Sequence, residues 1–137
     1  MIINERRLKM EIIKIVALSI SGLLLMFGGT ARIINPVKYY LKNTGIKLND
    51  EVNNLSEARG VGSVMTLGGI IMLLGTFVPE LTIASFVVAV LIFLGFGFGR
   101  SLSVTLDGKP NKLLIQGLIV EIVLGTVNIF CLISILV

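Results

Sequence analysis

Hydrophobic residues gather in four long runs along the chain, and shorter polar stretches separate them. A transmembrane helix needs about 20 mainly apolar residues, within a usual range of about 17–25. Four segments meet this length, at about residues 12–30, 57–78, 81–103 and 112–136. Because the runs are long and do not alternate apolar with polar residues, they predict membrane-spanning helices.

The amino-acid composition agrees with this pattern. Of the 137 residues, 55% are hydrophobic and 15% are charged, whereas a soluble domain carries about 25% charged residues. We therefore expect a multi-pass protein of a cell membrane, with the bacterial cytoplasmic membrane favoured. The first run follows Arg6, Arg7 and Lys9, as the apolar core of a secretory signal would, but we interpret it as a true span.

The segment between the first two spans carries the signals of a further, short helix. Asn35-Pro36 is typical of an N-cap followed by proline at the first helical position, and Gly45 is typical of a C-cap. The tyrosines and lysines between them favour the head-group layer of a membrane. We expect a helix at residues 36–44 that lies at the membrane interface; a docking surface for a partner is the alternative.

The remaining polar stretches predict helix starts and tight turns. Asn49-Asp50 is a candidate cap for a second helix that begins near Glu51, Val78-Pro79-Glu80 is a turn, and Asn111 is a candidate cap for the last helix. Short connections make adjacent helices antiparallel neighbours. The predicted fold class is an all-α membrane protein with a single domain, a four-transmembrane-helix antiparallel bundle with a short interfacial helix in the first loop.

Charge and cysteine content exclude several classes of function. The net charge is +4, without the dense basic run and interleaved aromatics that are typical of nucleic-acid binding. Cys131 is the only cysteine and there is no histidine, which excludes an internal disulfide and a four-ligand zinc site. No pair of nucleophile and base is visible, so an enzyme is not favoured, and no cofactor is predicted.

The basic residues leave the orientation in the membrane open. Four spans place both termini on one side, where Arg6, Arg7, Lys9 and Lys14 lie. The opposite loops, to which we assign Arg32, hold more basic residues and favour external termini. A first helix with a basic start favours the reverse.

Charged residues in or beside the spans are the candidates for function. They are Glu57, Arg59, Arg100 and Glu121. A charge at the centre of a bilayer costs about 2.5–3.5 kcal/mol, so such residues normally face protein or water. Glu121 must be embedded, because residues 122–137 alone are shorter than a usual span. It shares a helix face with Gly117 and Gly125, and a face of small and polar residues is a packing face in membranes.

The depth of these four charges predicts that they meet. At a rise of about 1.5 Å per residue, Glu57, Arg59, Arg100 and Glu121 all lie a short way below the same membrane face. Their charges sum to zero. They form either an ion network that locks the helices together or a pocket for the polar head of a ligand, and the sequence leaves both open.

Glycines are concentrated on the second and third spans. Gly95 and Gly99 form a GxxxG pair, the spacing that lets helix backbones approach in lipid. The surrounding string GFGFGR is similar to a phosphate-binding loop, but such a loop follows a strand. We therefore expect these glycines to pack helices.

Short motifs follow one another in a fixed order along the last three spans. The string SEARGVG at 56–62 precedes Gly68-Gly69 and Gly75, and Gly99-Arg100-Ser101 precedes DGKP at 107–110, Glu121 and Gly125. With Pro36 in the first loop, they resemble a bacterial family of unknown function, number 4345. That family looks like part of the DoxX-like group of small four-helix membrane proteins, some of which are associated with quinone-linked sulfur oxidation or oxidative-stress complexes. The resemblance implies a four-helix bundle with Glu57, Arg59, Arg100 and Glu121 as its polar positions, and supplies no activity.

Three functions fit these observations. The favoured one is a binding protein or accessory subunit that holds a lipid-like or quinone-like amphiphile at Glu57, Arg59, Arg100 and Glu121. The second is an interaction protein whose charges are structural, and the third is an oligomeric proton-coupled carrier with Glu121 as the relay. The expected partners are membrane lipid, a quinone or other amphiphile, and a membrane protein or a second copy, without nucleic acid.

Overall fold

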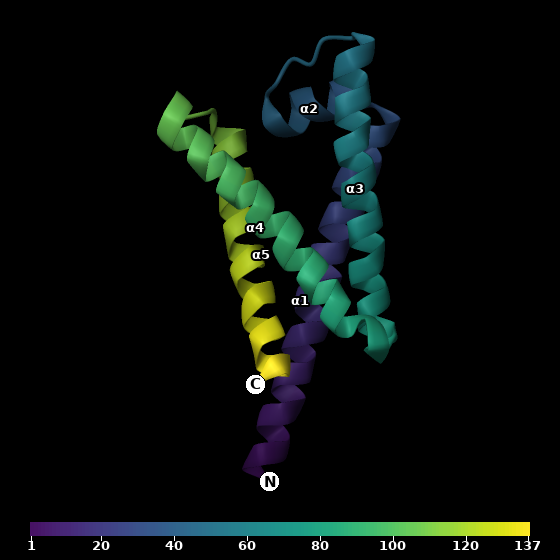
Figure 1. Ribbon diagram of the computed structural model, residues 1–137, viewed down its shortest axis with the longest axis vertical. Helices are drawn as coiled ribbons and strands as arrows, with labels where there is room; N and C mark the ends of the chain where they lie inside the picture. The colour runs from purple at the N-terminus through teal and green to yellow at the C-terminus, as the bar shows by residue number, and fades with distance from the viewer.

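Helices make up nearly the whole chain in the computed structural model, which describes residues 1–137 (Figure 1). They are α1 (Ile2–Ile34), α2 (Pro36–Thr44), α3 (Val52–Phe77), the 3-10 turn η1 (Pro79–Leu81), α4 (Thr82–Asp107) and α5 (Lys112–Leu136). Four of them, α1, α3, α4 and α5, are long and apolar enough to cross a membrane. The predicted all-α fold class with four spans is confirmed.

The helix ends follow the local sequence signals at most positions. The side chain of Asn35 accepts a hydrogen bond from the Lys38 amide at 3.1 Å, and Gly45 ends α2 with φ 70°, a left-handed conformation that glycine adopts without strain. Asn111 caps α5 by accepting from the Leu114 amide at 3.0 Å. The predicted start of α3 near Glu51 is confirmed, since Glu51 directly precedes the first helical residue, Val52. The predicted cap at Asn49-Asp50 was wrong, because no side chain caps this helix.

The long helices form two antiparallel pairs, α1 with α3 and α4 with α5 (Figure 1). The pairs converge near the chain termini and diverge toward the opposite end, where α2 lies between them. The Asn111 side chain donates to the Thr44 carbonyl at 2.8 Å. This bond ties the end of α2 to the turn between α4 and α5, so α2 spans the wide end of the bundle.

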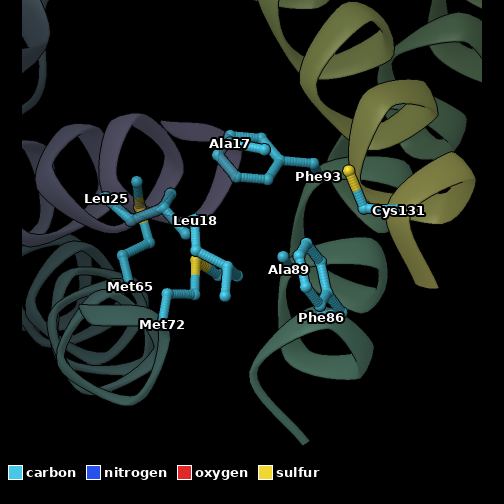
Figure 2. Close-up of a cluster of buried hydrophobic side chains, with 9 residues drawn as sticks. All are labelled: Ala17, Leu18, Leu25, Met65, Met72, Phe86, Ala89, Phe93 and Cys131. Atoms are coloured by element: carbon cyan, nitrogen blue, oxygen red, sulfur yellow. The ribbon is translucent and has the colours of Figure 1, made fainter. Parts of the chain in front are cut away.

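The apolar core lies where the two pairs converge and takes side chains from all four long helices (Figure 2). Its members are Ala17, Leu18, Leu25, Met65, Met72, Phe86, Ala89, Phe93 and Cys131. Only 24 of the 137 residues are buried, and large apolar side chains cover the outside of every long helix. A surface of this kind marks contact with lipid or another apolar partner, as expected for a small multi-pass membrane protein.

Two glycine pairs bring α1 and α3 into close contact. A Cβ atom at Gly29 would lie 2.5 Å from the Gly62 carbonyl oxygen, and one at Gly62 would lie 2.8 Å from the Gly29 oxygen. Gly22 and Gly69 oppose each other in the same way, at 2.9 and 2.6 Å. Because real Cβ atoms do not approach an oxygen this closely, the two backbones meet only where both helices carry glycine.

The GxxxG pair on α4 does not pack another helix of the chain. A Cβ atom at Gly95 or Gly99 would meet nothing within 4 Å. The opposite face of α4 carries Phe86, Ala89 and Phe93 and turns toward the core, which directs these glycines outward. The prediction that they bring helix backbones together was therefore wrong within one chain.

Candidate functional site

A cavity of about 380 Å³ lies between the two helix pairs, under α2. Ligand pockets commonly have volumes of about 300–1,000 Å³. Its polar and charged lining residues are Arg32, Tyr39, Lys42, Arg100, Gln116 and Glu121. Its apolar lining residues are Leu24, Leu25, Met65, Phe93, Phe96, Leu113, Leu114 and Val120. The cavity therefore offers contacts for both the polar and the apolar groups of a ligand.

Arg100 and Glu121 form an ion pair on one wall of the cavity. Arg100 Nη1 lies 3.1 Å from Glu121 Oε1, with the two side chains 26% and 13% exposed. The second carboxylate oxygen, Oε2, is buried and has no hydrogen-bond partner. Gly117 makes room for the pair, since a Cβ atom there would lie 2.6 Å from Arg100 Nη1. Glu121 thus faces the inside of the bundle, as the spacing of α5 predicts.

Arg32 enters the cavity from α1 and is 6% exposed. Its Nη1 donates to the sulfur of Met65 at 2.8 Å, and the guanidinium lies 4.5 Å from the centre of the Tyr39 ring. Its Nε is buried without a partner. Sequence reasoning missed this residue because it assigned Arg32 to a loop, whereas α1 continues to Ile34.

A sequence signal for Arg32 does exist. Gly28 precedes Arg32 by four residues, just as Gly117 precedes Glu121. In both cases the glycine lies beside a charged group on the same helix face. A Cβ atom at Gly28 would lie 3.7 Å from Arg32 Nη1 and 3.4 Å from the Tyr39 hydroxyl. A glycine one turn before a charged residue in an apolar run was the available clue.

Glu57 and Arg59 do not join the other two predicted site residues. Both side chains are exposed on α3, and neither lines the cavity. Arg59 Nε donates to the Ile33 carbonyl at 3.0 Å, and Glu57 lies in a separate surface groove with Gly60, Val64 and Phe96. The expected cluster of four charges is corrected accordingly, because the direction around α3 was inferred wrongly. Glu57 and Arg59 lie outside the cavity, so the binding proposed below does not include them.

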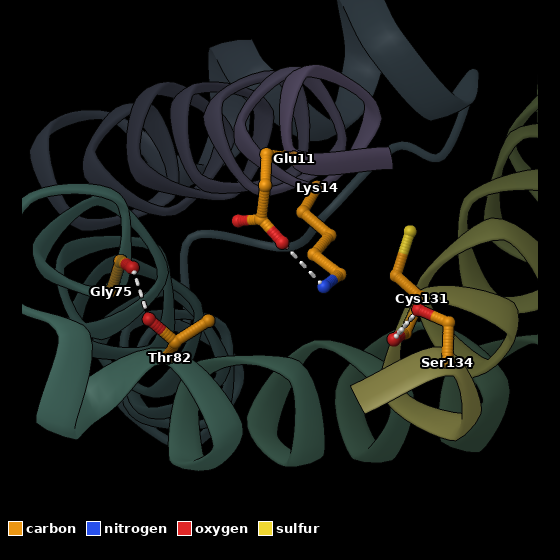
Figure 3. A network of polar contacts seen from close by, with 6 residues as sticks. All are labelled: Glu11, Lys14, Gly75, Thr82, Cys131 and Ser134. Atoms are coloured by element: carbon orange, nitrogen blue, oxygen red, sulfur yellow. Dashed lines mark hydrogen bonds and ion pairs between the residues drawn. The ribbon is translucent and has the colours of Figure 1, made fainter. Parts of the chain in front are cut away.

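Two further sets of polar contacts lie closer to the termini. In the core, Asn128 donates to the Ser21 hydroxyl at 2.8 Å and keeps a buried Oδ1 without a partner. Near the narrow end, Lys14 pairs with Glu11 at 2.8 Å, and Thr82 donates to the Gly75 carbonyl at 2.9 Å (Figure 3). No three His, Cys, Asp or Glu side chains lie together as metal ligands would.

These features define a class: small multi-pass membrane proteins with four long helices and a polar cavity at one end. The chain matches the family model described as Domain of unknown function (DUF4345) over residues 13–132. It belongs to this family, as its motifs predict. The match includes every residue of the cavity wall. No curated protein and no solved structure matches the chain significantly.

Proposed function

We propose that the protein binds a lipid-like or quinone-like amphiphile in the cavity under α2, as a binding protein or accessory subunit of the bacterial cytoplasmic membrane. The head of the ligand lies among Arg32, Arg100 and Glu121. One observation carries the proposal: buried atoms without partners, Arg32 Nε and Glu121 Oε2, occur on two walls of one cavity. Buried polar atoms almost always have hydrogen-bond partners, and a ligand head would supply them.

The apolar lining supports an amphiphile over a wholly polar ligand. Leu24 and Val120 line the cavity and are 43% and 40% exposed. Exposed apolar side chains at the cavity support an opening toward lipid. An alkyl or isoprenoid tail would leave through this opening into the bilayer while the head stays inside.

The chemistry of arginine suits several kinds of head. A guanidinium presents donors in a fixed fork that matches carboxylate and phosphate oxygens and also donates to carbonyls. The resemblance to the DoxX-like group, which we keep as part of the proposal, brings quinones into the set of candidate ligands. The partner of an accessory subunit would be another membrane protein.

Native mass spectrometry tests the proposal. The wild-type protein, released from detergent, is expected to retain an amphiphile that Arg100→Gln loses. Arg59→Gln is the matched control, because Arg59 carries the same charge but lies outside the cavity. The proposal fails if the wild type retains no amphiphile, or if wild type and Arg100→Gln retain the same one equally.

A purely structural role for the charges is the second candidate. The Arg100–Glu121 pair joins α4 to α5 at 3.1 Å and would by itself hold these helices together. That role does not explain why a charged residue is buried at position 32, since Arg32 forms no ion pair in the chain. For this reason we favour binding.

A further inference from the structure

Arg32 is a buried cation without a counter-ion in its own chain. The ion pairs of the protein are Lys14–Glu11 and Arg100–Glu121, and no carboxylate oxygen lies within 4.0 Å of the Arg32 guanidinium. An isolated charge buried away from water is strongly unfavourable unless it is paired. Glu121, the single acid of the cavity lining, is paired with Arg100 at 3.1 Å, so a second negative charge for Arg32 is expected from outside the chain.

The contacts that Arg32 does make position it without neutralising it. The sulfur of Met65, which accepts from Nη1 at 2.8 Å, is a weak acceptor. The rings of Tyr39 and Tyr40, with centres 4.5 and 5.6 Å from the guanidinium carbon, attract the cation but carry no net charge. Together these groups hold the guanidinium in one place and leave Nε without an acceptor.

The cavity as a whole has a positive surplus. Its charged wall residues are Arg32, Lys42 and Arg100 against the single acid Glu121. Glu121 already faces Arg100 at 3.1 Å. The charges of Arg32 and Lys42 therefore remain for a ligand. Arg32 is buried, whereas Lys42 is an exposed residue of α2.

Resting on the function proposed above, we propose that the head of the ligand is an oxyanion, a carboxylate or phosphate group, and that Arg32 is its anchor. The oxyanion accepts a hydrogen bond from Arg32 Nε and supplies the missing negative charge, while a hydroxyl elsewhere on the same head donates to Glu121 Oε2. A neutral quinone carbonyl accepts hydrogen bonds but leaves the charge unbalanced. Because the exposed apolar side chains of Leu24 and Val120 line the cavity, we expect the oxyanion to belong to an anionic lipid.

The test uses the full chain in nanodiscs of phosphatidylcholine, with phosphatidylglycerol, ubiquinone or inorganic phosphate added separately. Phosphatidylglycerol is expected to raise the melting temperature of the wild type, because a ligand of the native state stabilises it. Arg32→Gln should bind this lipid about tenfold more weakly, the effect of losing one charged hydrogen bond. Arg59→Gln removes the same charge from an exposed site and should keep the full response, which separates the anchor from general attraction to an anionic bilayer.

A second variant, Arg32→Lys, distinguishes loss of binding from loss of folding. Arg32→Lys keeps the charge but lacks Nε, so its loss of affinity should be smaller than that of Arg32→Gln. Melting in pure phosphatidylcholine shows whether each variant is folded. Since Arg32 has no ionic partner, neither change leaves an orphaned charge behind, and both are expected to melt cooperatively.

The outcomes separate the inference from the proposed function. If wild type and Arg32→Gln bind phosphatidylglycerol equally, Arg32 does not anchor the head of the ligand. Binding of ubiquinone but not phosphatidylglycerol overturns the oxyanion and leaves the amphiphile function standing, whereas binding of neither lipid overturns both. If inorganic phosphate alone raises the melting temperature, the ligand is an oxyanion but comes from a soluble source. This outcome overturns the proposal of a bound amphiphile.

Discussion

Helix α1 makes two contacts that are built in opposite ways. Toward α3, the pairs Gly22–Gly69 and Gly29–Gly62 bring backbone against backbone. Toward α5, the helix axes diverge (Figure 1) and the space between them holds Arg32 and the cavity. The α1–α3 contact has no room for a ligand, while the space between α1 and α5 is too open to be closed by packing. One helix thus packs closely against a neighbour on one side and lines the cavity on the other.

The comparison also shows that a glycine has no fixed meaning in a membrane helix. At Gly29 the missing side chain admits another backbone, at Gly117 it admits the guanidinium of Arg100, and at Gly95 it admits nothing from the chain. The role of each glycine therefore depends on which atoms a Cβ atom at its position would contact. A series of Gly→Ala changes therefore separates the two sides of α1 from the outer surface, and a change at Glu121 tests the cavity directly.

The largest expected effect is that of Glu121→Leu. It leaves Arg100 without its partner, and removing one member of a buried pair costs about 3–5 kcal/mol in soluble proteins. Lys42→Leu is the control, because Lys42 also lines the cavity but is exposed and has no ion pair. The melting temperature in detergent should fall far more for Glu121→Leu than for Lys42→Leu. Equal shifts would show that the pair does not support the bundle.

Gly29→Ala should come next and acts on the α1–α3 contact. The new Cβ atom would lie 2.5 Å from the Gly62 oxygen and 2.6 Å from the Thr66 amide nitrogen. These backbone atoms cannot rotate aside, so we expect a loss of about 1–3 kcal/mol, as for other overpacked sites. The melting temperature measures it, and an unchanged value would mean that α1 and α3 separate without cost.

Gly117→Ala should affect binding more than stability. The added Cβ atom meets only the end of the flexible Arg100 side chain, which can shift away from it. We expect less than about 1 kcal/mol of destabilisation, together with reduced retention of the amphiphile in native mass spectra. Full retention would show that the position of Arg100 does not matter to the ligand.

Gly95→Ala should have the smallest effect. Nothing lies within 4 Å of the added atom, and alanine is the better helix former. The change in stability should stay within about 0.5 kcal/mol, as for other exposed substitutions, and should lean toward stabilisation. A loss as large as that of Gly29→Ala would instead reveal that this face of α4 packs against a second chain.

The features that depend on local spacing were predicted from the sequence. The four long helices, the caps at Asn35 and Asn111, and the inward direction of Glu121 all follow from signals within a few residues. The direction of Glu57 and Arg59 depends instead on how α3 rotates against α1. Ala58, between them, is 3% exposed, so the two charged residues lie on either side of the buried face of α3 and not on it.

That rotation has a trace in the sequence. Ala58, Gly62, Met65, Gly69 and Met72 recur every three or four residues and form the buried stripe of α3. Small residues on this stripe mark the contact with α1, and the charges at 57 and 59 lie off it. The divergence of the two helix pairs has no such local trace, because it results from contacts between residues far apart. The cavity was therefore beyond local patterns, although Gly28, one turn before Arg32, was a local clue to that residue.

The hydrogen bond from Asn128 to Ser21 joins positions 107 residues apart, and this has a consequence for biogenesis. While the chain is being synthesised, Ser21 enters the bilayer long before Asn128 exists. The α1–α3 contact needs only the first two spans and can form early. The polar wall of Arg100 and Glu121 waits for the last helix to be inserted. A nascent chain paused before α5 would thus be anchored in the membrane but would lack one wall of the cavity, so the binding that we propose would become possible only once the last span is inserted.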